Sequence, residues 1–116
     1  MSILVDFGAP VSDSCEATGA YFGMDSSRIA GGVSHKASLH DFTFTKNPDS
    51  FGSVLIQHCS IGTVFARVTI ELYNDRGICS VKYRLGDVSI SAVVPGARGD
   101  SVGLIFATMK QKYYGE

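Results

Sequence analysis

The chain has 116 residues and a net charge of −1; 45% of its residues are hydrophobic and 18% are charged. Such a chain is long enough for one globular domain with a single core, and too short for two. The balanced charge leaves no general attraction for nucleic acid or an anionic membrane, and no apolar run reaches the roughly 20 residues of a membrane span. We therefore predict one domain over residues 1–116, with no nucleic-acid partner and no membrane insertion.

Two strands are predicted near the N-terminus, at Ile3–Phe7 and at Glu16–Met24. Gly19 and Gly23 in the second strand indicate a bulge or a strongly curved sheet.

The opening residues lack a basic region and reach a proline early, so no secretory signal peptide is expected and synthesis in the cytoplasm is the default. The three cysteines are odd in number and widely spaced, which favours free, buried thiols over a disulfide framework.

The segment Asp25–Ser34 is predicted to be a loop, because it is rich in serine and contains the pair Gly31-Gly32. Its apolar residues Ile29 and Val33 are not needed in an exposed loop, so we expect them either to fold back or to contact a partner. A third strand is predicted at Lys36–Thr45, with a bend near His40-Asp41 where the apolar alternation changes phase.

One helix is predicted between Asn47 and Gly62. Asn47 is expected to be the N-cap, with Pro48 as the first helical residue and Asp49 in the first turn. Gly62 is expected to end the helix in the left-handed conformation. A buried stripe follows the helical period: Phe51, Val54, Leu55, His58 and Cys59. A single helix among strands must pack on a sheet or fill a barrel.

The clearest alternation follows the helix and predicts a strand with five inward residues: Val64, Ala66, Val68, Ile70 and Leu72. Asn74–Gly77 is predicted to form a hairpin turn with glycine at positive φ. The next strand alternates in the same way, with its apolar residues at Cys79, Val81, Tyr83 and Leu85.

At Gly86-Asp87 the apolar phase changes to Val88, Ile90, Ala92 and Val94. This pattern fits either a tight hairpin or one long strand bent by a bulge. The last strand is predicted at Val102–Tyr114, with one apolar face formed by Val102, Leu104 and Phe106 and another formed by Ile105, Ala107 and Met109. A strand that is apolar on both faces is covered twice, either by the helix or by another subunit. In total, about seven strands and one helix predict a small antiparallel barrel or sandwich.

No catalytic constellation is found in the sequence, so we predict no catalytic, cofactor-binding or metal-binding residues and no enzymatic activity. His35 and His40 have opposite strand parity, and His58 is expected to be a structural histidine of the helix. The glycine pairs match no phosphate-binding motif, and the tripeptide Arg98-Gly99-Asp100 is interpreted as a turn. Lys110, Lys112 and the pair Tyr113-Tyr114 are interpreted as a solvated strand end rather than a nucleic-acid platform.

Four segments together resemble the haemolysin-coregulated protein (Hcp) family, the tube proteins of type VI secretion systems. The strand–helix unit of that family is similar to HDFTFTKNPDSFGSVLIQHCSIG, and the family's next strand is similar to ARVTIELYND. Its later segments are similar to VKYRLGDVSISAVVPG and DSVGLIFATMKQKYY. The chain departs from the family in having no tryptophan, with Tyr21-Phe22 where a tryptophan-bearing strand is usual, and in having Asp100 in place of a glutamate.

The resemblance implies a mainly β fold, a small antiparallel β-barrel with one outer helix. It further implies homo-hexameric rings that stack into a tube, are exported without a signal peptide when a sheath contracts, and can carry effectors in the lumen. Sheath, spike and effector proteins are the partners implied. The loop predicted at Asp25–Ser34 would contact the neighbouring ring through Ile29, Gly31, Gly32 and Val33. Contacts to neighbouring subunits of the same ring would be made by Ile105, Ala107 and Met109. A tail-tube protein of a phage or contractile injection particle, and a monomeric β-barrel binding module, are the alternatives.

Overall fold

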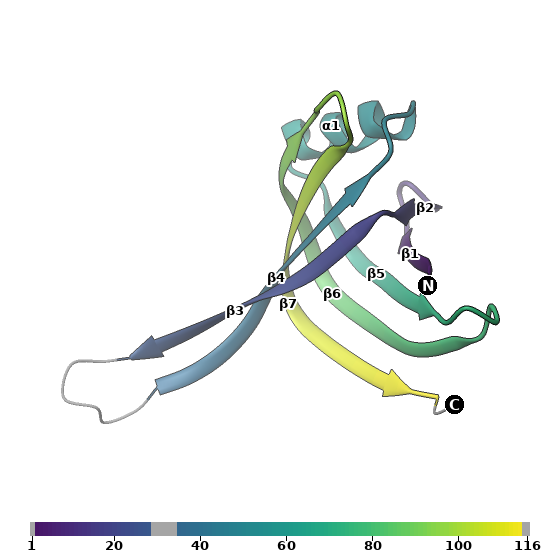
Figure 1. Ribbon diagram of the computed structural model, residues 1–116. Coiled ribbons are helices and arrows are strands. Elements are labelled where there is room, and N and C mark those ends of the chain that lie inside the picture. Colours follow the sequence, from purple (N-terminus) through teal and green to yellow (C-terminus); the bar gives the residue numbers. More distant parts are fainter. Residues whose placement is uncertain (1, 29–34, 115–116) are drawn as a thin grey trace.

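The computed structural model describes residues 2–28 and 35–114, with the side chains of residues 24–40 left undescribed. Its chain forms a mainly β fold with one short helix, as predicted (Figure 1). The bounds of its elements are β1 Ser2–Phe7, β2 Asp13–Ala17, β3 Gly19–Arg28, β4 His35–Lys46, α1 Phe51–Ile61, β5 Val64–Tyr73, β6 Cys79–Val94 and β7 Asp100–Tyr113.

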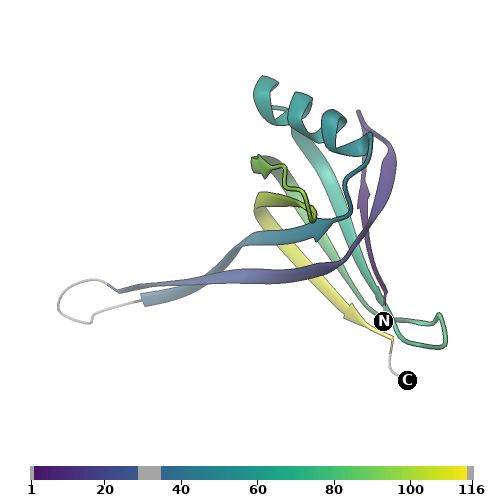
Figure 2. The same ribbon diagram turned by 45° about the horizontal axis from the view of Figure 1, so that its top comes forward.

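All strands join one antiparallel sheet in the order β2-β1-β5-β6-β7-β4-β3. The two edge strands, β2 and β3, are consecutive in the chain and are separated by Thr18 alone. The sheet must therefore curl until its edges approach each other, since one residue cannot span the width of an open sheet. The Thr18 N–H donates to the Thr45 carbonyl across this junction (2.7 Å). The result is a curled half-barrel, with α1 lying over one end (Figure 2).

The prediction of one continuous strand at Glu16–Met24 is wrong. The chain leaves β1 after Ala17, turns at Thr18 and then pairs with β4. The hydroxyls of Thr18 and Thr45 lie 2.9 Å apart and form a hydrogen bond at this change of partner. Composition could not reveal the break, because both halves have the alternation of a strand.

The first part of the predicted loop is strand, because β3 continues through Asp25 to Arg28. The rest of it, residues 29–34, lies outside the described residues, and β4 begins at His35. Together β3 and β4 form a long hairpin that projects away from the rest of the sheet (Figure 1). The bend predicted near His40-Asp41 is confirmed: Gly23 pairs with Asp41 and Met24 with Leu39, so His40 is an extra residue in β4. Such a bulge increases the local twist and directs the hairpin away from the barrel.

The core lies inside the curled sheet and is closed at the helix end by aromatic side chains. Phe7 of β1 is fully buried and lies at the centre of three ring contacts. Its ring centroid lies 5.3 Å from that of Phe65, 5.9 Å from that of Phe51 and 6.5 Å from that of Phe44. One side chain therefore connects β1 with β4, β5 and α1.

The helix begins later than predicted, at Phe51, and Ser50 rather than Asn47 occupies the N-cap position. The Phe51 N–H donates instead to the carboxylate of Asp49 (3.0 Å). Lys46 Nζ also donates to Asp49 (2.6 Å) and to the Asn47 carbonyl (2.9 Å). These contacts hold residues 47–49 in a non-helical turn, so the favourable cap residue Asn47 is not used.

Lys46 is a buried cation that joins three elements. Its ammonium group lies 3.4 Å from Asp100 at the start of β7, in addition to its contact with Asp49 before α1. Burial by itself would lower the pKa of Lys46, but the hydrogen bonds to Asp49 and Asp100 outweigh it and raise the pKa. The charged form of Lys46 is thereby favoured at the junction of β4, α1 and β7.

The buried stripe of the helix is confirmed. Leu55 is fully buried, and Phe51, Val54, His58 and Cys59 are half-buried. The left-handed stop at Gly62 is also confirmed, with φ of 73°. The helix contacts β6 through this face, so its position depends on apolar burial more than on its capping.

Leu55→Ala is expected to lower the free energy of unfolding by about 2–5 kcal/mol, because it leaves a cavity under the helix. Urea unfolding followed by circular dichroism measures the change. Ile56→Ala, on the exposed side of the same helix, is the control and should change stability by about 0.5 kcal/mol or less. Equal effects at the two positions would contradict docking of the helix through Leu55.

The predicted inward face of β5 is wrong in its first part. Phe65 and Val68 are buried, whereas Ala66 and Arg67 both face outward. The same change of phase occurs in β6 and β7, where Gly86-Asp87 and Ala107-Thr108 lie opposite these residues. Three neighbouring strands therefore bend at the same level of the sheet and form a corner. The pattern of one strand can show its own change of phase, but it cannot show that the three strands bend together.

At Gly86-Asp87 the structure has the bent strand and not the hairpin, because β6 runs without interruption from Cys79 to Val94. Asp87 has φ of 54°, and a Cβ at Gly86 would collide with the Thr108 hydroxyl. A second shift between Ile90 and Ala92 turns Ala92 and Val94 outward, contrary to prediction, and places Val93 against the core. The hairpin turn at Asn74–Gly77 is confirmed, with Gly77 at φ of 78°.

Candidate functional site

The residues predicted to contact other subunits do not share one face. Ile105 and Ala107 are exposed on the outer face of β7, whereas Met109 is half-buried and packs against the core. Met109 turns inward because the corner at Ala107-Thr108 reverses the phase of the strand. Its assignment to the same apolar face as Ile105 is therefore wrong.

An apolar row crosses the outer face of the sheet beside Ile105. Val64 pairs with Ser89, and Ser89 pairs with Ile105, so the three side chains point to the same side. Val64 is 61% exposed and Ile105 is 45% exposed. Ile61, at the end of α1, is 65% exposed and lies three residues before Val64. Large apolar side chains gathered in this way are typical of a surface that another protein covers.

The four residues predicted to stack rings, Ile29, Gly31, Gly32 and Val33, lie outside the described residues. The strands on either side of them are described and belong to the projecting β3–β4 hairpin (Figure 2). The flanking strands thus lie away from the barrel, and the contact of these four residues with a neighbouring ring stays a prediction.

His58 and the three cysteines, which could in principle take part in chemistry, lie in surroundings that are typical of structural residues. His58 Nδ1 lies 2.8 Å from the Thr63 hydroxyl, and its ring meets Phe65 edge to face. This confirms the structural interpretation of His58. All three cysteines are free and half-buried, and burial raises the pKa of the Cys15 thiol to about 12. A thiol with so high a pKa is almost entirely protonated at neutral pH and is a poor nucleophile.

Over the described residues, no three His, Cys, Asp or Glu side chains gather closely enough to hold a metal ion. The turn interpretation of Arg98-Gly99-Asp100 is supported, because the Gly99 N–H donates to the Gly96 carbonyl (3.2 Å) and Asp100 is buried beside Lys46. No helix in the described part of the chain is long and apolar enough to cross a membrane.

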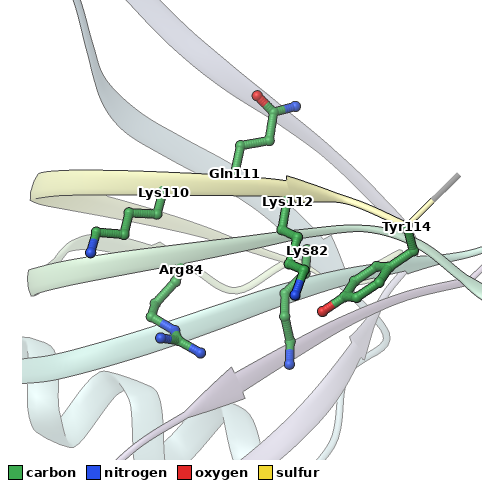
Figure 3. A pocket seen from close by; sticks show the side chains of 6 residues that line it. All are labelled: Lys82, Arg84, Lys110, Gln111, Lys112 and Tyr114. Carbon is green, nitrogen blue, oxygen red and sulfur yellow. The ribbon is translucent and has the colours of Figure 1, made fainter.

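A basic face covers the outer side of β5, β6 and β7, from the corner to the end of the sheet where the β5–β6 turn lies. Five cations belong to it: Arg67, Lys82, Arg84, Lys110 and Lys112. They are half of the ten lysines and arginines of the chain. Figure 3 shows the part of this face around an open hollow of about 370 Å³, with Tyr114 at its end and Gln111 on the other side of β7.

Comparison with known families identifies the chain. Residues 16–113 match the family described as "Type VI secretion system effector, Hcp". The chain belongs to the Hcp family. The resemblance in the four segments is thereby confirmed, and it extends from β2 to the end of β7. No match was found among the curated proteins.

Solved structures of Hcp proteins and of a related particle share the fold. Hcp1 from Salmonella typhimurium superposes with a TM-score of 0.80 at 19% identity, over 99% of this chain and 89% of that one. A mutant form of Hcp1 from the E. coli EAEC 042 pathovar gives a TM-score of 0.79 at 15% identity, over 97% and 90% of the two chains. The tube-terminating cap of the anti-feeding prophage gives 0.63 at 11% identity, over 96% and 87%. At these identities the likeness concerns the fold alone.

The basic face was missed in the sequence. From the sequence, Lys110 and Lys112 are interpreted as a solvated strand end, because no other stretch of the chain is basic. The register of β6 against β7 places Lys82 opposite Lys112 and Arg84 opposite Lys110. The alternation of Lys82 and Arg84 on the polar side of their strand was the only available signal, and it becomes informative only when the pairing is known.

Proposed function

We propose that this Hcp-family chain is a tube protein of a type VI secretion system. It assembles into homo-hexameric rings, the rings stack into a hollow tube, and the tube is exported when a sheath contracts. Effector proteins travel in the lumen, and sheath and spike proteins are the other partners. The observation that carries this proposal is the match to the Hcp family over residues 16–113.

The outer face of the sheet supports assembly from copies of the same chain. Val64, Ile105 and Ile61 present large apolar side chains to solvent on one chain. A closed ring needs two different surfaces on each subunit that fit one another, and an apolar row beside the corner provides one of them. We assign this row, with Ala107, to the contact between subunits. Stacking is assigned to Ile29, Gly31, Gly32 and Val33.

Light scattering with negative-stain imaging of the same peak tests the proposal. Six copies of the 12.4 kDa chain have a mass of about 74 kDa. A peak of that mass with rings that have open centres is the expected result. A monomer at every concentration, even with the sheath and spike proteins of the same system present, would contradict assembly into rings.

Ile105→Asp is expected to shift the mass of the assembly from about 74 kDa towards the 12.4 kDa monomer, because a carboxylate would be desolvated in the subunit contact. The fold should be kept, since the side chain is exposed in the single chain. Ile78→Asp is the matched control: Ile78 is 51% exposed but lies at the β5–β6 turn, away from the row. If the Ile105 variant assembles as well as the control, the row is not a subunit contact.

A second candidate function is tube protein of a contractile injection particle outside type VI secretion. The fold is shared with the anti-feeding prophage cap and with a chain of the sheath–tube complex of an extracellular contractile injection system, the latter at a TM-score of 0.62. Export that stops when the type VI sheath gene is deleted would favour the secretion system over this candidate.

A further inference from the structure

The basic face concentrates positive charge on a chain that is slightly acidic overall. Against its five cations stand two carboxylates, Asp6 and Glu71. The face therefore carries a net charge of +3, and the rest of the chain carries −4, since the whole has −1. Segregation of charge on this scale produces a local potential that attracts anionic groups even when the whole protein is nearly neutral.

The positions of these cations oppose the stability of the sheet. Lys82 lies directly opposite Lys112, and Arg84 lies directly opposite Lys110, on the same outer side of β6 and β7. Like charges at facing positions of neighbouring strands repel each other and destabilise the sheet. Folding alone does not explain two such pairs in succession, whereas the attraction of all four cations to an anionic partner would offset both repulsions.

The cations are also largely unneutralised within the chain. Lys82 Nζ lies 3.3 Å from the Glu71 carboxylate, and Lys112 lies 5.2 Å from the centre of the Tyr114 ring. Across the described residues, no carboxylate forms an ion pair with Arg67, Arg84 or Lys110. Their donors are therefore free to bind an incoming anion around the hollow that Figure 3 shows.

We propose that the basic face of β5, β6 and β7 binds an acidic segment of a partner polypeptide. Carboxylates spaced along a peptide can reach Arg84, Lys110 and Lys112, while the peptide's N–H groups can donate to Asp6 and Glu71. A nucleic-acid strand fits less well, because its continuous phosphates would be repelled by those two carboxylates. Its bases would also have to compete with Lys112 for the ring of Tyr114.

A second copy of the chain is a less suitable occupant. Its carboxylates outside the basic face are spread over separate elements, with Asp13 and Glu16 on β2, Asp41 on β4 and Asp87 at the corner of β6. The proposal does not depend on ring formation, because all five cations belong to one chain.

Fluorescence anisotropy with a labelled polyglutamate peptide tests the proposal. The comparison probe is a labelled oligo-dT of the same net charge, and both are titrated at ionic strengths of about 0.01 M and about 0.15 M. The variant Arg84→Gln/Lys110→Gln removes two charges from the centre of the face. The control Arg76→Gln/Arg98→Gln removes the same charge from two exposed turn residues outside it. The mass of each variant is measured in the same buffer, so that loss of assembly and loss of binding are distinguished.

The expected result is salt-dependent binding of polyglutamate that is tighter than binding of oligo-dT. The face variant should weaken it about tenfold or more, and the control variant should change it by about twofold or less. The proposal is overturned if polyglutamate does not bind at low ionic strength, or if both variants lose affinity equally. Tighter binding of oligo-dT would instead identify a nucleic-acid face, and loss of self-assembly in the face variant alone would identify a contact between copies.

Discussion

Phe7→Ala is expected to lower the free energy of unfolding by about 3–5 kcal/mol. The side chain is fully buried, and its ring contacts those of Phe44, Phe51 and Phe65. Truncation removes the apolar contact and three aromatic contacts together, and the cavity lies where β1, β4, β5 and α1 meet. Because four elements line this site, it cannot collapse by moving one of them.

Urea denaturation at a fixed protein concentration measures the effect of Phe7→Ala, with Phe7→Leu and Tyr21→Ala as controls. Leucine keeps most of the volume and should cost less than about 1.5 kcal/mol. Tyr21 is exposed, so its truncation should cost about 0.5 kcal/mol or less. A loss at Phe7 no larger than the loss at Tyr21 would show that the aromatic cluster is not the core of this barrel.

Lys46→Met is expected to destabilise the protein by about 3–5 kcal/mol, although methionine has a similar length and is apolar. The side chain of Lys46 is 1% exposed and that of Asp100 is 9% exposed, and their charged groups lie 3.4 Å apart. Removing the cation leaves the Asp100 carboxylate desolvated without its partner. It also frees Asp49 and the Asn47 carbonyl, which position the start of the helix.

The comparison variant for Lys46 is Lys82→Met. Lys82 pairs with Glu71 at 3.3 Å, but its side chain is 29% exposed, so its loss should cost about 1 kcal/mol or less. The double variant Lys46→Met/Asp100→Asn should recover part of the stability, because no unpaired buried charge remains. Equal costs at Lys46 and Lys82, or no recovery in the double variant, would contradict a buried ion pair.

Local signals predicted the elements with strong periodicity or special backbone. The helical stripe around Leu55, the stop at Gly62 and the hairpin at Asn74–Gly77 are all confirmed. Each depends on residues close together in sequence, through helical periodicity or through glycine at positive φ. The errors occur where distant contacts override local preference. Asn47 is not the N-cap because Lys46, which also contacts Asp100 at the start of β7, forms a competing turn with Asp49.

The candidate surfaces were predicted less completely than the fold. Ile105 and Ala107 are exposed on β7 as a contact surface requires, but Met109 is not, because the corner reverses the phase after Ala107. The apolar row needs the register of β5, β6 and β7 to bring Val64 near Ile105. The register between neighbouring strands is not encoded in the alternation of any one strand.

The sequence by itself determined the mainly β class, the single helix and the resemblance to the Hcp family, because these depend on local periodicity and on motifs in order. Only the tertiary structure decided the break at Thr18, the common corner of β5, β6 and β7, and the grouping of Lys82 and Arg84 with Lys110 and Lys112. The physical reason is that curvature and cross-strand register are properties of the whole sheet. They are set by which strands pair and by how tightly the sheet must curl, and no single strand carries that information.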